Sequence, residues 1–175
     1  RPALYNGKLA LGQGLVASYY AGVEDTDFAG LAAQTPAHLR LEPWVSGGDL
    51  AAAASAVVWQ GKIAAPMEGS YRFDGEADGP LQLELDGILL LDTPQGKAST
   101  ATLLLSQGWH NLTLRYRSGG AGTLRLHWQP PGAITPTAIG PDFLAALHPN
   151  AAVVDLPLPN LPAPQTGPVL AVGEP

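Results

Sequence analysis

The chain has 175 residues, a formal net charge of −6 at pH 7 and no cysteine, which excludes disulfides, cysteine-ligated metal sites and thiol catalysis. Its nine basic residues are spread out, so we expect no nucleic-acid partner, and no apolar run approaches the ~18 residues that predict a membrane-spanning helix. Charged residues make up only 14% of the chain, whereas glycine and proline number 21 and 17, a composition typical of a turn-rich all-β protein. Because it opens at Arg1 without a signal peptide, we expect it to be a segment of a longer protein.

The first third of the chain predicts one strand and a long irregular region. Residues 1–13 form a short N-terminal lead. The stretch 14–22 is bounded by glycines and rich in β-forming residues, so it predicts the first strand. Residues 23–55 show no regular pattern, and we expect a loop or a short helix there, with a helical turn at 51–54.

From residue 56 onward the sequence alternates apolar and polar residues, which predicts strands with one buried and one wet face. The predicted strands are 57–64, 70–77, 81–86, 88–92, 100–106, 109–117 and 123–129. Asp86-Gly87 predicts a tight two-residue hairpin turn, and the run 118–122 predicts a second, glycine-rich turn. About seven or eight short strands at roughly ten-residue spacing predict an antiparallel β-sandwich or flattened barrel.

The last part of the chain has a different composition. From Pro149 onward, seven of 27 residues are proline, which predicts an extended, polyproline-like tail over 149–175. Such a tail is either a linker or a segment packed on the domain surface. We favour packing through its apolar residues, which are Val153, Val154, Leu156, Leu158 and Leu161.

Four blocks of the sequence occur in the order and spacing of a known family. They are Gly14-Leu15 before Ser18-Tyr19-Tyr20; Trp59-Gln60-Gly61-Lys62-Ile63 with Pro66 and Gly69-Ser70-Tyr71-Arg72-Phe73; Asp78-Gly79 through Leu83, Leu85-Asp86-Gly87 and Leu91-Asp92; and Gly108 to Leu114, Tyr116, Leu124, Leu126-His127-Trp128 with Pro130-Pro131-Gly132. Together they resemble the PA14 domain, a β-sandwich module of bacterial toxins, glycosidases and yeast adhesins. The resemblance covers residues 14–148 and implies a PA14-like fold there.

The resemblance also implies a function and a place for the ligand. The family is chiefly linked to carbohydrate recognition, usually as a non-catalytic module. In the adhesin branch, two adjacent aspartates before the central hairpin bind Ca²⁺, which holds sugar hydroxyls, and a second loop supplies an asparagine. Here Ala77-Asp78 stands in place of the two aspartates, and residues 118–122 offer neither asparagine nor carboxylate. We therefore expect no metal cofactor and keep Asp78 only as a weak calcium candidate.

The candidate ligand-binding residues lie in three places along the chain. They are Asp78 and Gly79 before the hairpin, Ser118, Gly119 and Gly120 in the glycine-rich turn, and Trp44 beside a proline. We expect Trp44 to be the exposed stacking platform, because Trp59, Trp109 and Trp128 fall at strand positions that match the family's core.

Surface carboxylates raise the question of an enzyme. Asp74, Glu76, Glu84 and Asp86 lie on wet faces of neighbouring predicted strands, where a glycosidase pair is one interpretation. Solvated pairing with arginines of adjacent strands is the commoner arrangement, and the sequence holds no nucleophile elbow, zinc-protease or P-loop motif. We therefore predict a non-enzymatic, extracytoplasmic module that binds glycans. The alternative is a structural spacer or protein-docking domain that has lost the calcium and sugar site.

Overall fold

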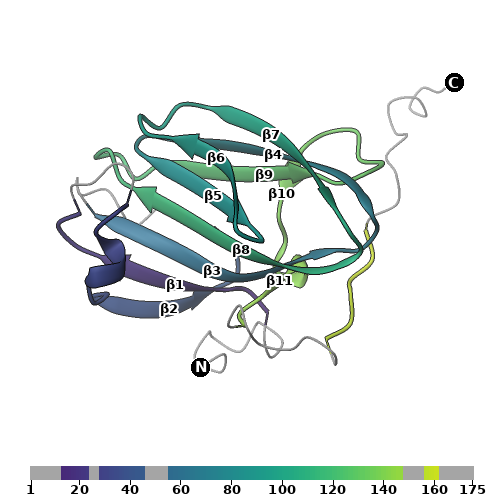
Figure 1. Cartoon of the computed structure of the whole chain (residues 1–175), viewed down its shortest axis with the longest axis horizontal. Coiled ribbons are helices and arrows are strands. Elements are labelled where there is room, and N and C mark those ends of the chain that lie inside the picture. The colour runs from purple at the N-terminus through teal and green to yellow at the C-terminus, as the bar shows by residue number, and fades with distance from the viewer. Residues whose placement is uncertain (1–12, 24–27, 46–54, 148–155, 162–175) are drawn as a thin grey trace, which may run out of the picture.

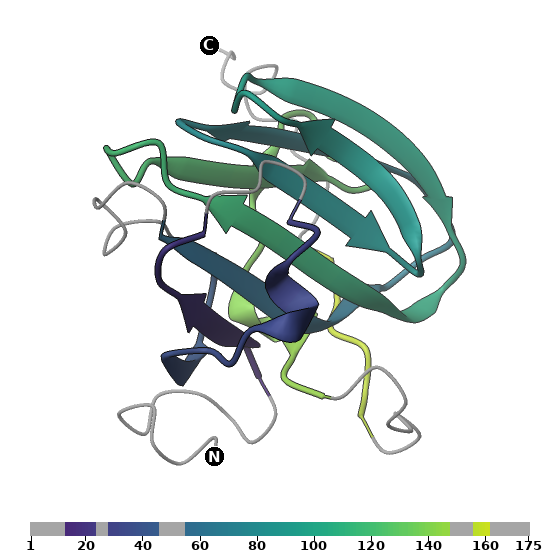
Figure 2. The same cartoon turned by 60° about the vertical axis from the view of Figure 1, so that its left-hand side comes forward.

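The chain forms two antiparallel β-sheets that pack face to face (Figures 1 and 2), in a computed structural model that describes residues 13–23, 28–45, 55–147 and 156–161. The first sheet has the order β2 (His38–Glu42), β1 (Leu15–Tyr20), β3 (Ala56–Ala65), β8 (Gly108–Arg117), β5 (Leu81–Leu85) and β6 (Ile88–Thr93), and β11 (Leu144–Ala145) also pairs with β3. The second sheet has the order β10 (Thr137–Ala138), β9 (Leu124–Gln129), β4 (Gly69–Ala77) and β7 (Ser99–Leu105). This architecture confirms the predicted antiparallel β-sandwich.

The apolar/polar alternation correctly identified the buried faces of the central strands. In β8 the buried positions are His110, Leu112, Leu114 and Tyr116, as the sequence predicted. The β5–β6 hairpin turns at Asp86-Gly87, where both residues have positive φ angles of 50° and 80°. Positive φ at both central positions is the geometry that makes Asp-Gly a favoured hairpin sequence.

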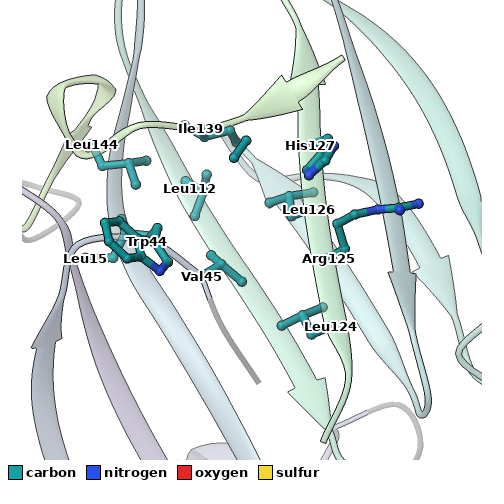
Figure 3. A pocket seen from close by; sticks show the side chains of 11 residues that line it. Leu15, Trp44, Val45, Leu112, Leu124, Arg125, Leu126, His127, Ile139 and Leu144 are labelled. Atoms are coloured by element: carbon teal, nitrogen blue, oxygen red, sulfur yellow. The ribbon is translucent and has the colours of Figure 1, made fainter. Parts of the chain in front are cut away.

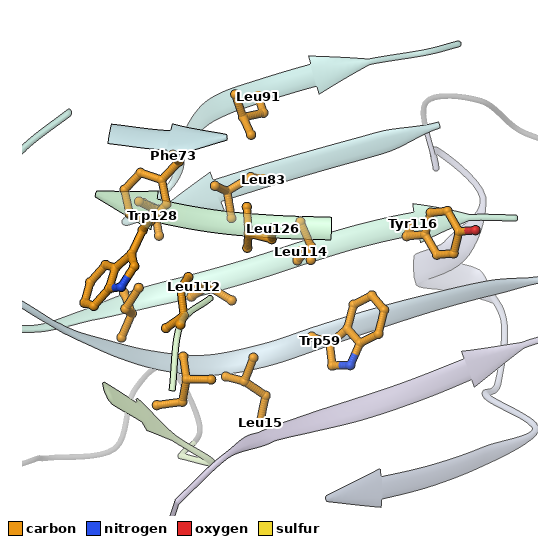
Figure 4. Packing of buried hydrophobic residues seen from close by; sticks show 14 of the residues in the cluster. Leu15, Trp59, Phe73, Leu83, Leu91, Leu112, Leu114, Tyr116, Leu126 and Trp128 are labelled. Atoms are coloured by element: carbon orange, nitrogen blue, oxygen red, sulfur yellow. The ribbon is translucent and has the colours of Figure 1, made fainter. Parts of the chain in front are cut away.

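The core lies between the two sheets (Figure 4). Trp59 and Leu114 of the first sheet face Phe73, Leu126 and Trp128 of the second. Burying a large apolar side chain stabilises the folded state by about 1.5–3 kcal/mol, so this layer makes a large contribution to the free energy of folding. The burial of Trp59 and Trp128 confirms their predicted core role, whereas Trp109 is only half-buried.

The region 23–55 holds more structure than its sequence indicated. It contains β2 and the short 3-10 helix η2 (Leu31–Ala33). Strand β2 was not predicted, although its five residues, His38 to Glu42, alternate polar and apolar side chains. The run is short, and its burial does not follow the alternation, because Leu39 is exposed whereas Glu42 is buried. The helical turn predicted at 51–54 lies outside the described residues.

A short piece of the C-terminal tail runs over the sandwich. The indole Nε1 of Trp109 donates a hydrogen bond to the carbonyl of Leu156 at 3.1 Å. Leu156, Leu158 and Leu161 are half-buried, whereas Val153 and Val154 lie outside the described residues. Within the described ranges, no helix has the length and apolar character that a membrane span requires.

Candidate functional site

Five of the six predicted site residues come together where two strand connections meet at one end of the sandwich (Figure 1). Asp78 and Gly79 follow β4, and residues 118–120 follow β8. The amide of Asp78 donates to the carbonyl of Thr123 at 3.0 Å, which extends the β4–β9 ladder by one bond. The two connections, separated by about forty residues of sequence, therefore form one tip of the molecule.

The carboxylate of Asp78 holds this tip together. Its Oδ1 accepts a hydrogen bond from the hydroxyl of Tyr116. Its Oδ2 accepts hydrogen bonds from three backbone amides, those of Gly119 at 3.2 Å, Ala121 at 2.7 Å and Gly122 at 3.0 Å. Backbone amides of one loop that point at the same oxygen form an anion-binding site, and here the anion is the chain's own side chain.

These contacts alter the acidity of both partners. Partial burial acts to raise the pKa of Asp78, but the hydrogen bonds from Tyr116 and the loop amides outweigh it, so the pKa of this carboxyl is lowered. Burial, with a further contribution from the neighbouring Asp78 carboxylate, raises the pKa of the Tyr116 hydroxyl. Asp78 is therefore ionised and Tyr116 is protonated at neutral pH.

Three glycines allow the loops to approach so closely. A Cβ atom on Gly79 would overlap the carbonyl oxygen of Arg117, and one on Gly119 would overlap the carbonyl oxygen of Asp78. Gly96, between β6 and β7, has a φ of +72°, and its Cβ would lie 2.5 Å from the backbone of Gly79. A third connection therefore packs on the same tip through bare backbone.

Ser118 is buried inside the loop, where it stabilises the loop conformation, and it does not contribute to the exposed surface. The residue is 1% exposed, and its hydroxyl accepts a hydrogen bond from the amide of Gly120 at 3.0 Å. Its own amide donates to the carbonyl of Ser55 at 2.8 Å. Gly119, Gly120 and Ala121 are exposed, so a ligand can reach this part of the loop.

The residues at the tip do not fit a calcium ion. Calcium takes six to eight oxygen ligands, usually including more than one carboxylate. At the position of the expected calcium ligands the chain has the carboxylate of Asp78. Its Oδ2 faces three N–H donors, whose positive ends would repel a cation. No group of three or more potential metal-ligating side chains exists among the residues that the structure describes. The donor set stabilises a carboxylate, not a metal.

A pocket of about 270 Å³ opens beside Asp78. It is lined by Glu76, Ala77 and Asp78 at the end of β4 and by Thr123, Leu124 and Arg125 at the start of β9. Arg125 donates to Glu76 at 2.7 Å, and both side chains are about half exposed, at 56% and 53%. The pocket therefore presents carboxylate, hydroxyl and guanidinium groups to solvent.

Trp44 lies apart from the tip, on the open flank of the sandwich (Figure 3). It is 53% exposed, as the sequence predicted, and its role as a stacking platform stays a prediction. It lines a second pocket of about 110 Å³ between the two sheets, together with Leu15, Leu112 and Leu144 on one side and Leu126 and Ile139 on the other. We call this pocket the inter-sheet slot. Leu124 and Arg125 border both the slot and the tip pocket.

A buried carboxylate anchors the segment that carries Trp44. Glu42, at the end of β2, is 6% exposed and accepts hydrogen bonds from the Tyr19 hydroxyl and from Trp59 Nε1, the latter at 2.8 Å. Arg40 forms an ion pair with it at 3.2 Å. Trp44 therefore lies two residues after Glu42, whose carboxylate is held by these contacts.

The surface acids are paired, as expected. Three of them pair with arginines: Asp74 with Arg72 at 2.9 Å, Glu76 with Arg125 at 2.7 Å and Glu84 with Arg115 at 3.4 Å. The carboxylate of Asp86 is hydrogen-bonded with His110 Nδ1 at 2.6 Å. The sequence did not predict the partner of Asp86, because His110 lies on the buried face of β8. From there its ring contacts the hairpin turn.

Sequence reasoning missed three contributors to the tip. Tyr116 was assigned to the core, but its hydroxyl needs a partner when buried and finds Asp78. Thr123 and Arg125 were predicted only as solvent-facing residues of the strand 123–129. The signal for Tyr116 was available, since it is the polar-tipped member of an otherwise apolar set at the end of β8.

Comparison with known proteins gives one family match. A family model described as the PA14 domain matches residues 13–140. No protein among the curated ones matches the chain.

Several solved structures share the fold. Two anti-sigma factor domain-containing proteins, one of them from Clostridium clariflavum, superpose with TM-scores of 0.64 and 0.61 at 21% and 22% identity. Each match covers 81% of this chain, and the chain spans about half of their length, 51% and 50%. A "PA14 sugar-binding domain from RTX adhesin" has a TM-score of 0.63 at 21% identity and covers 78% of this chain and 99% of its own.

Proposed function

Because the chain belongs to the PA14 domain family, we propose that it is a non-catalytic, glycan-binding module of a longer, extracytoplasmic protein. Its ligand-binding surface is the pocket beside Asp78, at the tip where the β4–β5 and β8–β9 connections meet. The sugar-binding PA14 domain of an adhesin has the same fold, which supports this class of function.

The observation that carries the proposal is the chemistry of the tip pocket. Sugars are recognised by hydrogen bonds to their hydroxyls from side chains that both donate and accept. Glu76 supplies an acceptor, Arg125 a donor and Thr123 both, within one pocket of about 270 Å³. That volume is close to the ~300 Å³ at which ligand pockets begin.

The module binds its ligand without calcium under this proposal. In a calcium-dependent relative, the cation would organise the loops and hold sugar hydroxyls directly. Here the Asp78 carboxylate already organises the β8–β9 connection through three amides. The pocket is therefore preformed, which lowers the entropic cost of binding.

A glycan array probed with and without EDTA tests this proposal. We expect binding that EDTA does not change and that Glu76→Gln weakens about tenfold, because the substitution removes the carboxylate from the pocket. Glu84→Gln is the matched control, since Glu84 also pairs with an arginine on a neighbouring strand but lies outside the pocket. Binding abolished by EDTA would show that the site uses a metal after all.

The second candidate function is a structural spacer or protein-docking domain. Among the residues that the structure describes, the tip holds no calcium ligand set, and this favours the alternative. An array on which no glycan binds under either condition would support this alternative and refute the glycan-binding proposal.

A further inference from the structure

The wall of the inter-sheet slot on the side of the second sheet is a strand edge. Four consecutive residues of β9, 124–127, line the slot, although alternate side chains of a strand point to opposite faces. Consecutive residues can line one pocket only where the backbone edge itself forms the wall. Figure 3 shows how the described chain passes this edge: it leaves β10 (Thr137–Ala138) at Ile139 and crosses toward Leu144.

The ladder on this side of β9 is short. Within the described ranges, β10 is the strand that pairs here, and it contacts only His127 and Trp128. The amide of Asp78 donates a hydrogen bond to the carbonyl of Thr123, so the backbone of Thr123 points toward β4. Because bonding alternates along an antiparallel strand, the N–H and C=O of Leu124 point the other way, toward the slot.

The rest of the slot is apolar. Leu15, Leu112 and Leu144 form its floor from the first sheet, and Leu126 and Ile139 close it from the second. Trp44 stands at the rim, where about half of its surface contacts solvent. The site therefore combines a flat aromatic face, a small apolar cavity and one backbone amide edge.

We propose that the inter-sheet slot binds the acetamido group of an N-acylated amino sugar. An acetamido group carries one N–H and one C=O, which match the C=O and N–H that Leu124 presents, and a methyl group that suits the apolar floor. The sugar ring stays outside and stacks on Trp44. This inference rests on the proposed glycan-binding function and adds a second subsite with a defined chemical class.

The size of the slot selects this substituent over a whole sugar ring. An apolar cavity of ~150 Å³ holds a benzene molecule, so one of about 110 Å³ accommodates an acetyl group but not a hydrated pyranose. Sugar hydroxyls buried against five aliphatic side chains would also lose their hydrogen bonds to water. The ring is better placed on the indole, where its apolar face contacts the aromatic surface.

The test compares N-acetylglucosamine and N-acetylgalactosamine with glucose, galactose and glucosamine. We expect the two acetamido sugars to bind about tenfold more tightly than the others. In saturation-transfer NMR the acetamido methyl should give the strongest protein-to-ligand signal, and the amide resonance of Leu124 should shift. Equal binding of acetylated and unacetylated sugars would overturn the inference.

Variants separate the slot from the tip pocket. Trp44→Ala should remove the preference for acetamido sugars, and Ile139→Phe, which fills the slot from within, should do the same if Trp44→Ala perturbs folding. Leu104→Ala is the control, because Leu104 is 75% exposed on β7, outside the slot. Acetamido binding that survives both slot variants would refute the inference.

The remaining outcomes distinguish this inference from the proposed function. Glycan binding without acetamido preference, and weakened by Glu76→Gln, would refute the slot while leaving the tip pocket intact. No binding of any sugar would refute both. N-acetylalanine methylamide carries the same amide without a ring, so its binding as tightly as the sugars would assign the slot to acylated peptides and overturn the inference.

Discussion

At the residue scale, Asp78 is the centre of the molecule's most specialised region. Its carboxylate receives four donors, from the Tyr116 hydroxyl and three loop amides. Hydrogen bonds to a charged group contribute more than neutral ones, about 1.5–3 kcal/mol each in favourable settings, although their effects do not add. The single aspartate thus joins the β4–β5 and β8–β9 connections by hydrogen bonding.

Asp78→Asn tests this role. The substitution removes the charge and turns amide hydrogens toward donors, so we expect the free energy of unfolding to fall by about 2–3 kcal/mol. Urea denaturation of the variant measures the change. Asp92→Asn serves as the control, because Asp92 is exposed and accepts one long hydrogen bond, from Gln82 at 3.3 Å. Equal stability of the two variants would contradict the assigned role.

The lowered pKa of Asp78 also predicts a dependence of stability on pH. The unfolded chain takes up the proton first, at the ordinary pKa of about 3.9, whereas the folded chain keeps the carboxylate ionised to lower pH. The contribution of Asp78 is therefore complete above that value and is lost as the pH falls through the folded pKa. Unfolding midpoints measured from pH 6 to about pH 2 should fall less steeply in Asp78→Asn, with the remaining slope including Asp74, whose pKa is also lowered.

At the scale of elements, three strand connections meet through bare backbone. Gly79, Gly96 and Gly119 each place a Cα where a side chain would collide with the chain opposite. The tip therefore depends on glycine in two different ways. Gly96 needs it for its positive φ as well as for space, whereas Gly79 and Gly119 need it for space alone.

Gly119→Ala should disrupt the packing of the tip. Its Cβ would overlap the backbone carbonyl of Asp78, so the connections must separate, and we expect a loss of about 3 kcal/mol. Gly140→Ala is the matched control, because its φ is −71° and the nearest atom to its Cβ would lie 3.9 Å away. Thermal unfolding of both variants measures the effect, and a Gly119→Ala protein as stable as the control would disprove the close approach.

At the scale of the whole molecule, we propose that the tail packs on the sandwich through residues 156–161. The hydrogen bond from Trp109 to Leu156 and the half-buried leucines support this arrangement. A tail that is packed on the domain surface has fewer orientations than a tail that is free in solvent. It would therefore restrict the orientation of a neighbouring domain.

Deleting residues 148–175 should expose Trp109 and lower the free energy of unfolding by about 1–2 kcal/mol, since one hydrogen bond and part of three leucine contacts are lost. Tryptophan emission should shift to longer wavelength while the far-UV circular dichroism keeps its β-sheet form. Deleting only residues 162–175 leaves the contact in place and provides the control. Identical emission and stability in the two truncated proteins would rule out the packed tail.

Most of the sheet could be predicted because buried strands obey a period of two. The alternation in β4, β8 and β9 and the Asp-Gly hairpin followed from local rules. Strand β2 was missed because its alternation lasts only five residues and does not match its burial, since Leu39 is exposed and Glu42 is buried. The candidate residues Asp78, Gly79 and Trp44 were each singled out from the sequence. Tyr116, Gly96 and Arg125 were not, because they join the candidate site only through neighbours far away in sequence.

The sequence by itself determined the class of fold, the family and the loss of one aspartate from the expected calcium position. It did so because alternation, turn residues and motif spacing are local properties. Only the tertiary structure decided what Asp78 does, since its amide partners lie about forty residues away and meet it through sheet pairing. The same holds for the inter-sheet slot, where, within the described ranges, β10 ends after two residues and pairs with only part of the β9 edge beside Trp44. Such gaps arise where separate strands end in space, and no local pattern records them.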